Sequence, residues 1–237
     1  MTAIFITATG TGVGETFVAA SLIRHLRQFG HQVDAIKPIT CGYEPSQAAT
    51  SDPGILLAAL GRPFSPEEVE RISPWRFRSA IAPDLAAKQE GRTIEVDRVI
   101  GYCQHAIENR REVLLVEGVG GVMVPLDESR TILDVMMALR LPLLLVTGSY
   151  AGAISHTLTA IDSLFRRDMN VLATIVCETP GSPLPLDDVV ATIGRFTEPV
   201  LGVPQLSQDG DPGATSPLGR LFGGRSRPAP PPAGQRR

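Results

Sequence analysis

The residues best suited to chemistry lie in a loop of small side chains between Thr7 and Thr16. The loop follows a strand-like apolar run, contains Gly10, Gly12 and Gly14, and leads into an amphipathic stretch. Its backbone N–H groups can surround a phosphate, and the dipole at the start of the following helix favours negative charge. The Thr16 hydroxyl stands where it can reach a magnesium ion. The pattern indicates a nucleotide-binding loop, and the alternative is a glycine-rich turn without a ligand.

Glu15 departs from this pattern, because such a loop normally carries lysine just before the threonine. At an effective dielectric constant near 20, two unit charges about 4 Å apart interact by roughly 4 kcal/mol. A carboxylate here should therefore weaken the binding of β- and γ-phosphates, unless Mg²⁺ intervenes or the side chain turns away. In a purely structural turn, Glu15 would instead stabilise the first helical turn through the macrodipole.

Lysine is rare in this chain, since only Lys37 and Lys88 among the 22 basic residues are lysines. Lys37 ends a predicted strand, at the edge of the sheet where open α/β folds bind ligands. A lysine there suggests a need for a compact, titratable ammonium that arginine cannot replace. The alternative is an incidental surface lysine.

Two acidic residues are candidate magnesium ligands. Asp52 precedes a predicted helix, so it either caps that helix, with Pro53 at the first helical position, or binds the metal. Glu117 follows the apolar run 113–116 and precedes three glycines within four positions. A carboxylate at the end of a buried strand needs a partner, and a metal ion is the natural one. The alternative for Glu117 is a solvated acid in a turn.

A last group of candidate binding residues, at 148–157, follows the apolar run 143–147. Small residues begin the next helix there, and free N–H groups at a helix start suit a carboxylate or phosphate. His156 lies just inside this helix and has no acid or nucleophile close by in sequence. We therefore interpret His156 as a structural residue rather than a catalytic one.

The hydrophobic pattern predicts the elements that position these groups. Short runs rich in Val, Ile and Leu alternate with longer amphipathic stretches, which is typical of a parallel sheet covered by helices on both faces. The expected fold class is α/β, in a three-layer P-loop NTPase-like arrangement with a mainly parallel sheet. We expect strands near 3–7, 32–37, 112–117, 142–147, 171–177 and 199–203. We expect helices near 16–29, 54–60, 83–90, 95–110, 131–140, 151–167 and 186–196, with a lobe beside the sheet from 41–92.

Composition suits one domain, since 237 residues with 43% hydrophobic content can bury one full core. We assign this domain to residues 1–207 and a disordered tail, rich in Gly, Pro and Arg, to residues 208–237. The three cysteines are widely separated and form no CxxC pair, so neither a disulfide framework nor a zinc site is expected. Signal-peptide and membrane-spanning patterns are missing, and we expect a cytoplasmic protein without a membrane partner.

The charge distribution argues against nucleic acid as a partner. Residues 220–237 carry five arginines and no acid, which leaves 17 basic against 25 acidic residues in the rest of the chain. A surface of that balance binds nucleic acid poorly.

In order along the chain, these groups resemble the motifs of the dethiobiotin synthetase family. The loop resembles Gly-Thr-Asp-Thr-x-Val-Gly-Lys-Thr, Lys37-Pro38 with Gly42 resembles Lys-Pro-Val-x-Ser-Gly, and Ser51-Asp52 resembles Asn-Ser-Asp. The similarity runs from Phe5 to about Leu206. Further matches are Ala82-Pro83 with Ala86-Ala87, Val116-Glu117-Gly118-x-Gly120-Gly121 with Pro125-Leu126, His156-Thr157-Leu158, and Leu201-Gly202-Val203-Pro204.

The resemblance implies an ATP-dependent, Mg²⁺-dependent ligase that closes a ureido ring. In that reaction 7,8-diaminononanoate takes up CO₂ as a carbamate, ATP phosphorylates the carbamate, and the second amine closes the ring to give dethiobiotin with loss of phosphate. The implied substrates are the diamine, CO₂ or bicarbonate, and ATP. The resemblance also implies a homodimer with substrate sites near the subunit boundary.

The same resemblance implies roles for individual residues. Lys37 and Thr11 would be catalytic, and Thr16, Asp52 and Glu117 would hold the metal. The implied nucleotide contacts are Gly12, Val13, Gly14, Glu15, Thr16, Phe17, Glu117, Glu178 and Pro204. The implied substrate contacts are Thr11, Lys37, Cys41, Gly120, Tyr150, Ala151, Gly152, Ile154 and Ser155.

Four departures from the family pattern leave other functions open. Glu15 replaces the loop lysine, Ala8 and Gly10 replace a glycine and an aspartate, Cys41 replaces a serine, and Cys177-Glu178 replaces the Ala-Asn that recognises the base. One alternative is a catalytically impaired relative that keeps the fold and binds a ligand or partner. The other is a nucleotide-switched ATPase of the partition type, although residues 8–13 carry no lysine of the kind common in that class.

Overall fold

The main sheet has six strands, and every neighbouring pair runs parallel. The computed structural model describes residues 2–205, so the predicted tail at 208–237 lies outside the described residues. The sheet order is β2-β5-β1-β6-β7-β8. All six predicted strands are confirmed, at β1 (Thr2–Ala8), β2 (Val33–Ile36), β5 (Val113–Gly121), β6 (Leu143–Gly148), β7 (Val171–Cys177) and β8 (Val200–Val203).

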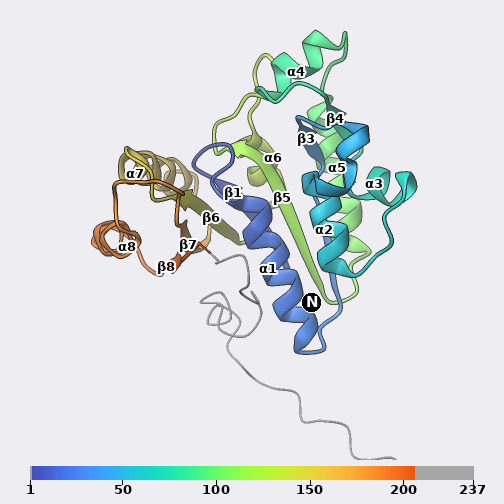
Figure 1. Cartoon of the computed structure of the whole chain (residues 1–237). Coiled ribbons are helices and arrows are strands. Elements are labelled where there is room, and N and C mark those ends of the chain that lie inside the picture. The colour runs from blue at the N-terminus through green and yellow to red at the C-terminus, as the bar shows by residue number, and fades with distance from the viewer. Residues whose placement is uncertain (1, 206–237) are drawn as a thin grey trace, which may run out of the picture.

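Helices cover both faces of this sheet (Figure 1), which confirms the α/β fold class. One core packs α1 (Glu15–Gln28), α2 (Asp52–Leu60) and α3 (Pro66–Ile72) against the sheet. The opposite core contains α5 (Val96–Glu108), α6 (Ile132–Leu139) and α7 (Ala153–Phe165), and α8 (Leu186–Ile193) packs on Val176 of β7.

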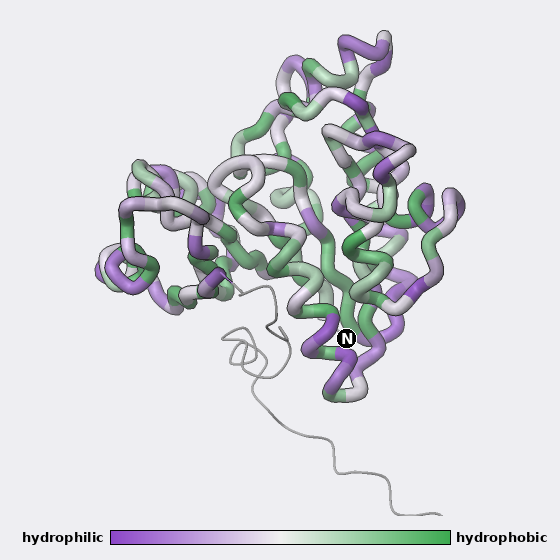
Figure 2. The backbone as a smooth tube through the Cα atoms, viewed as in Figure 1, coloured by the Kyte–Doolittle hydropathy of each residue, from purple (hydrophilic) through white to green (hydrophobic). Residues whose placement is uncertain are grey.

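Alternation along the strands explains why both faces are apolar. In β1, Ile4 and Ile6 belong to the α1 side and Phe5 to the α5 side, as expected when successive side chains point to opposite faces. In Figure 2 the central strands are mostly hydrophobic, and hydrophilic residues lie mainly on helices and loops.

The segment between β2 and α5 contains a second, smaller sheet that the sequence analysis missed. Here β3 (Ile39–Cys41) pairs in parallel with β4 (Trp75–Phe77). The segment also holds a 3₁₀ helix (Pro45–Thr50) and α4 (Pro83–Gln89). Strands of three residues are too short to show an alternating pattern. The sequence analysis also missed α3, although Ser65 caps it by accepting a hydrogen bond from the Glu68 N–H at 3.2 Å.

Strand β5 extends four residues beyond its predicted end, to Gly121, so Glu117 lies inside the strand rather than at its end. Glu117 pairs with Ile6, and the register with β1 then shifts before Ala8. A Cβ atom at Gly118 would lie 3.0 Å from the Phe5 ring. Glycine therefore lets β1 and β5 stay close together just beyond the acidic residue.

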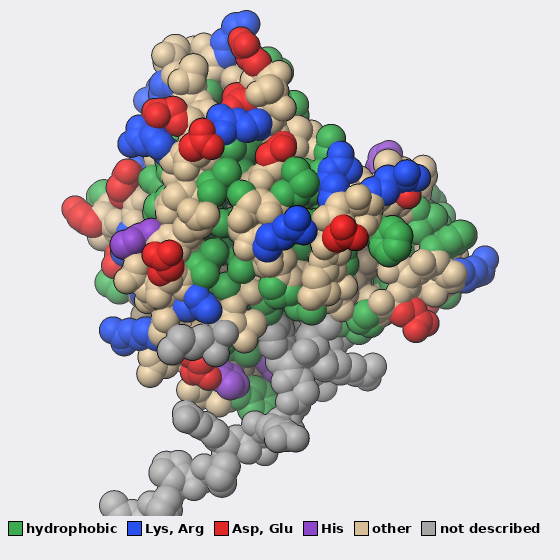
Figure 3. Space-filling model, turned by 180° about the vertical axis from the view of Figure 1, so that it is seen from behind, with side chains coloured by type: hydrophobic (Ala, Val, Ile, Leu, Met, Phe, Trp, Pro, Cys, Tyr) green, Lys and Arg blue, Asp and Glu red, His purple; other side chains and the backbone are tan. Residues whose placement is uncertain are grey.

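The face behind the view of Figure 1 carries acidic and basic side chains mixed over its surface (Figure 3). Some charges pair locally, as Arg166 Nε and Asp162 Oδ2 do at 2.7 Å near the end of α7. Among residues 2–205, no helix is both long and apolar enough to span a bilayer.

Candidate active site

Lys37 is the centre of a charged cluster built from three separate segments. It follows β2 directly, and its Nζ lies 2.7 Å from Asp52 Oδ2 at the start of α2 and 2.6 Å from Glu117 Oε1 in β5. Lys37 and Glu117 are buried, at 6% and 1% exposure, whereas Asp52 remains partly open to solvent. Lys37, predicted as catalytic, and the predicted metal ligands Asp52 and Glu117 therefore lie together.

The electrostatics of this cluster favour a charged lysine. Burial alone lowers the pKa of Lys37, but the charges of Glu117 and Asp52 outweigh burial and raise the pKa above its usual value. Burial raises the pKa of Glu117, and the Lys37 ammonium opposes this shift. Lys37 is thus a fixed positive charge rather than a base that gives up its proton.

Asp52 does not cap α2. The N-cap residue is Ser51, and Asp52 is the first residue of the helix, with Pro53 second. The Asp52 carboxylate instead pairs with Lys37. The capping interpretation of Asp52 is therefore wrong.

Glu117 has one oxygen that fits a metal ion. Oε1 accepts hydrogen bonds from Lys37 Nζ at 2.6 Å and from Thr16 Oγ1 at 2.5 Å. Oε2 is buried and has no hydrogen-bond partner. A buried carboxylate oxygen without a partner is costly, and Mg²⁺ is commonly bound by one or two carboxylates with water and phosphate oxygens.

The protein would supply few of the ligands of such a metal. Within residues 2–205, no group of three His, Cys, Asp or Glu residues could hold a metal ion. Glu117, Asp52 and the Thr16 hydroxyl suit a magnesium ion whose other ligands are water and phosphate, so these residues fit the predicted metal.

The loop between β1 and α1 has the backbone of an anion-binding turn. Gly12 and Gly14 have φ values of 71° and 113°, in the left-handed region that favours glycine. The Glu15 side chain bends back toward this loop, and its Oε2 accepts hydrogen bonds from the N–H groups of Val13 and Gly14, both at 3.1 Å. Burial raises the pKa of Glu15, and its backbone hydrogen bonds and Lys37 act in the opposite direction.

A cleft of about 360 Å³, here called the Lys37 cleft, lies on one side of the loop. It brings together eight of the predicted site residues with part of the segment before α4 and residues that follow Glu117. Its lining is Thr11, Gly12, Glu15, Thr16, Lys37, Cys41, Asp52, Ala80, Ile81, Ala82, Pro83, Val119, Gly120 and Val124. Burial raises the pKa of the Cys41 thiol in this cleft to about 11.

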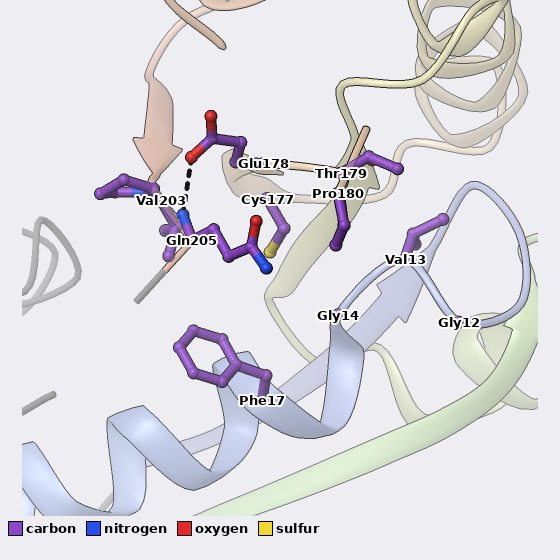
Figure 4. A pocket seen from close by; sticks show the side chains of 11 residues that line it. Gly12, Val13, Gly14, Phe17, Cys177, Glu178, Thr179, Pro180, Val203 and Gln205 are labelled. Carbon is purple, nitrogen blue, oxygen red and sulfur yellow. Dashed lines mark hydrogen bonds between the residues drawn. The ribbon is translucent and has the colours of Figure 1, made fainter. Parts of the chain in front are cut away.

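A second pocket of about 350 Å³, here called the Phe17 pocket, lies on the other side of the loop (Figure 4). The predicted residues Glu178 and Pro204 line it, and Glu178 Oε2 accepts a hydrogen bond from the Gln205 N–H at 2.8 Å. The full lining is Gly12, Val13, Gly14, Phe17, Cys177, Glu178, Thr179, Pro180, Val203, Pro204 and Gln205.

Sequence reasoning had placed Cys177 and Val203 in family motifs without a role in binding, and it missed Thr179, Pro180 and Gln205, which also line the Phe17 pocket. These residues lie at or just after the ends of β7 and β8, which pair with each other at the sheet edge. Two signals could have found the others, namely the family motifs next to them and the fact that both strands end at the edge where ligands bind.

The predicted substrate contacts after β6 lie outside both the Lys37 cleft and the Phe17 pocket. Tyr150, Ala151, Gly152, Ile154 and Ser155 line neither of the two pockets. The Tyr150 hydroxyl lies 2.9 Å from His156 Nδ1, and Ile154 packs with the α8 core. The structure therefore does not bring these five residues to Lys37 within one chain.

The sequence matches the family described as AAA domain over residues 2–211. It is 44% identical to the ATP-dependent dethiobiotin synthetase of Methylobacterium nodulans over 82% of this chain and 89% of the relative. It is 46% identical to the ATP-dependent dethiobiotin synthetase of Acidiphilium cryptum over 78% of this chain and 83% of the relative.

Solved structures show a related fold at low sequence identity. The MinC:MinD cell division protein complex of Aquifex aeolicus contains a chain that aligns with a TM-score of 0.51 and 15% identity, covering 86% of this chain and 81% of that one. This likeness supports the P-loop NTPase-like α/β fold alone.

Proposed function

The chain belongs to the AAA-domain family and, within it, to the ATP-dependent dethiobiotin synthetases. From this premise we propose that it closes the ureido ring of dethiobiotin. The substrates would be 7,8-diaminononanoate, CO₂ or bicarbonate, and ATP. The observation that carries the proposal is the meeting of Lys37, Asp52, Glu117 and Thr16 beside the loop.

The charged cluster suits the first half of the reaction. One amine of the substrate adds to CO₂ and loses a proton, which leaves an anionic carbamate. The fixed ammonium of Lys37 can stabilise this anion and, later, the phosphorylated carbamate. Thr11 and Gly120 face the same cleft and would position the substrate, with Cys41 beside them.

Phosphoryl transfer then depends on positioning and charge neutralisation. The carbamate oxygen attacks the γ-phosphate of ATP and releases ADP. The second amine then attacks the carbon of the phosphorylated carbamate, and closure of the ring releases phosphate and the amine's proton. A magnesium ion held by Thr16, Asp52 and Glu117 would neutralise phosphate charge. The loop N–H groups would hold the phosphates, and the Phe17 pocket would hold the base near Glu178 and Pro204.

We also propose a homodimer in the cytoplasm, where ATP and reduced cysteines are found. The exposed residues Ala151, Gly152 and Ser155 line neither pocket of their own chain, which suits a role for segment 150–155 at a subunit boundary. Sedimentation equilibrium would test this part, and a monomer at working concentration would contradict it.

The activity is tested by following dethiobiotin from diamine, bicarbonate and Mg·ATP. We expect product with the full chain and at least a hundredfold lower rate in Lys37→Met. The matched control is Lys88→Met, because Lys88 is the other lysine of the chain and is exposed. No product from the full chain at saturating substrates would refute the proposal.

A further inference from the structure

Glu15 makes a contact within the loop that the proposed reaction does not use. The N–H groups of Val13 and Gly14 both point to one oxygen of this side chain, at 3.1 Å each. Successive N–H groups that converge on one oxygen are the arrangement by which such loops bind phosphate. The Glu15 carboxylate therefore lies where a phosphate oxygen would be bound.

We propose that Glu15 is a built-in competitor of the nucleotide's phosphates, an inference that rests on the proposed use of ATP. The carboxylate holds the N–H groups of Val13 and Gly14, and a polyphosphate binds the loop only after this side chain has moved away. Glu15 thus sets the affinity of the loop for phosphate without contacting the nucleotide base.

The Glu15 side chain has room to move while the ends of the loop stay in place. A Cβ atom at Gly14 would lie 2.7 Å from Cys177 Sγ, and one at Gly121 would lie 3.1 Å from the Thr9 carbonyl oxygen. The two ends of the loop, at Thr9 and Gly14, are therefore packed against β5 and β7, whereas Cβ atoms at Gly10 and Gly12 would meet no atom within 4 Å. Glu15 also lines the Lys37 cleft, which gives its side chain open space beside the loop.

The expected effect follows from the fraction of time that the carboxylate holds the loop. When a binding-competent state is populated for one tenth of the time, the apparent affinity falls about tenfold, or about 1.4 kcal/mol. The penalty applies to ligands that carry phosphates. A nucleoside that uses only the Phe17 pocket does not need the two N–H groups.

The test compares two probes by titration calorimetry, namely inorganic tripolyphosphate with Mg²⁺ and adenosine. We expect Glu15→Ala to bind tripolyphosphate at least tenfold more tightly than the natural sequence and adenosine with less than a twofold change. Glu15→Gln should bind tripolyphosphate more tightly as well. The control is Glu108→Gln, because this exposed residue near the end of α5 removes the same charge far from the loop.

Amide NMR signals give a second measurement on the unmodified chain. We expect the Val13 and Gly14 amide signals to shift when tripolyphosphate is added, and to shift in Glu15→Gln without it. Unchanged tripolyphosphate affinity in folded Glu15 variants would overturn the proposal. It would also be overturned by an equal gain for adenosine, or by loop amide signals that do not respond to tripolyphosphate.

The outcome separates this inference from the proposed function. Tighter tripolyphosphate binding by Glu15→Ala in a chain that makes no dethiobiotin would support the competition and contradict the ligase activity. Dethiobiotin formation together with unchanged tripolyphosphate affinity would support the ligase activity and contradict the competition.

Discussion

Lys37 gains its character from residues far away in the sequence. The rarity of lysine and the position after a strand indicated a special cation, and the structure adds the two carboxylates that hold it. The direction of the Glu15 side chain could not be predicted in the same way, because it depends on the backbone at Gly12 and Gly14 and on where the loop N–H groups point. Sequence reasoning thus identified the participants better than it identified their contacts.

Removal of the Lys37 charge should destabilise the protein as well as stop the reaction. Lys37→Met leaves Glu117 as a buried carboxylate without its ion-pair partner, and breaking such a pair typically costs roughly 3–5 kcal/mol of folding free energy. Urea unfolding would measure the loss. The double variant Lys37→Met/Glu117→Gln should recover part of it, and no recovery would show that the lost ion pair is not the cause.

Cys41 should react slowly with alkylating reagents at neutral pH. Burial raises the pKa of its thiol to about 11, above the usual value of about 8.5, so the reactive thiolate is scarce until the solution becomes strongly alkaline. Labelling with iodoacetamide should therefore speed up as the pH approaches 11. Mass spectrometry of the labelled peptide, with Cys41→Ser as control, would detect fast labelling at pH 7 if this expectation is wrong.

At the scale of elements, long periodic segments were predictable and short ones were not. The alternation in β1 and the helical spacing of Val18, Leu22 and Leu26 in α1 are strong local signals. Strands β3 and β4 exist because they pair with each other, and three residues carry too little pattern to reveal that partner. The end of β5 was misplaced because the glycines that usually mark a turn here allow close packing against β1.

Position 14, the N-cap of α1, should tolerate only glycine. Gly14→Ala places a Cβ 2.7 Å from Cys177 Sγ on a backbone with φ of 113°, and strain of this kind typically costs about 1–3 kcal/mol. We expect a lower free energy of unfolding and weaker nucleotide binding. Gly10→Ala is the matched control in the same loop, since its Cβ would meet no atom within 4 Å. Equal stability of the two variants would contradict the close packing described for Gly14.

At the scale of the whole molecule, parallel strands explain how distant residues meet. Every strand of the main sheet runs in the same direction, so the segments after β1, β2, β6, β7 and β8 emerge at one rim. That rule predicted that Lys37 lies at the edge of the sheet where ligands bind, and the loop after β1 lies at the same edge. It did not predict the strand order, which depends on how the helical crossovers pack and which puts β5 between β2 and β1.

The carboxylates of Glu15, Asp52 and Glu117 lie near a single ammonium, that of Lys37, beside the loop. This excess of acidic groups should affect the association rates of charged ligands. The protonated amino end of the diamine is drawn toward the rim, while metal-free ATP is repelled from it. Dissolved salt screens both effects, over about 8 Å at physiological ionic strength. Added potassium chloride should therefore slow diamine association and speed that of metal-free ATP in stopped-flow measurements. If salt changed the association rates of the two ligands in the same direction, the charges of the cluster would not control association.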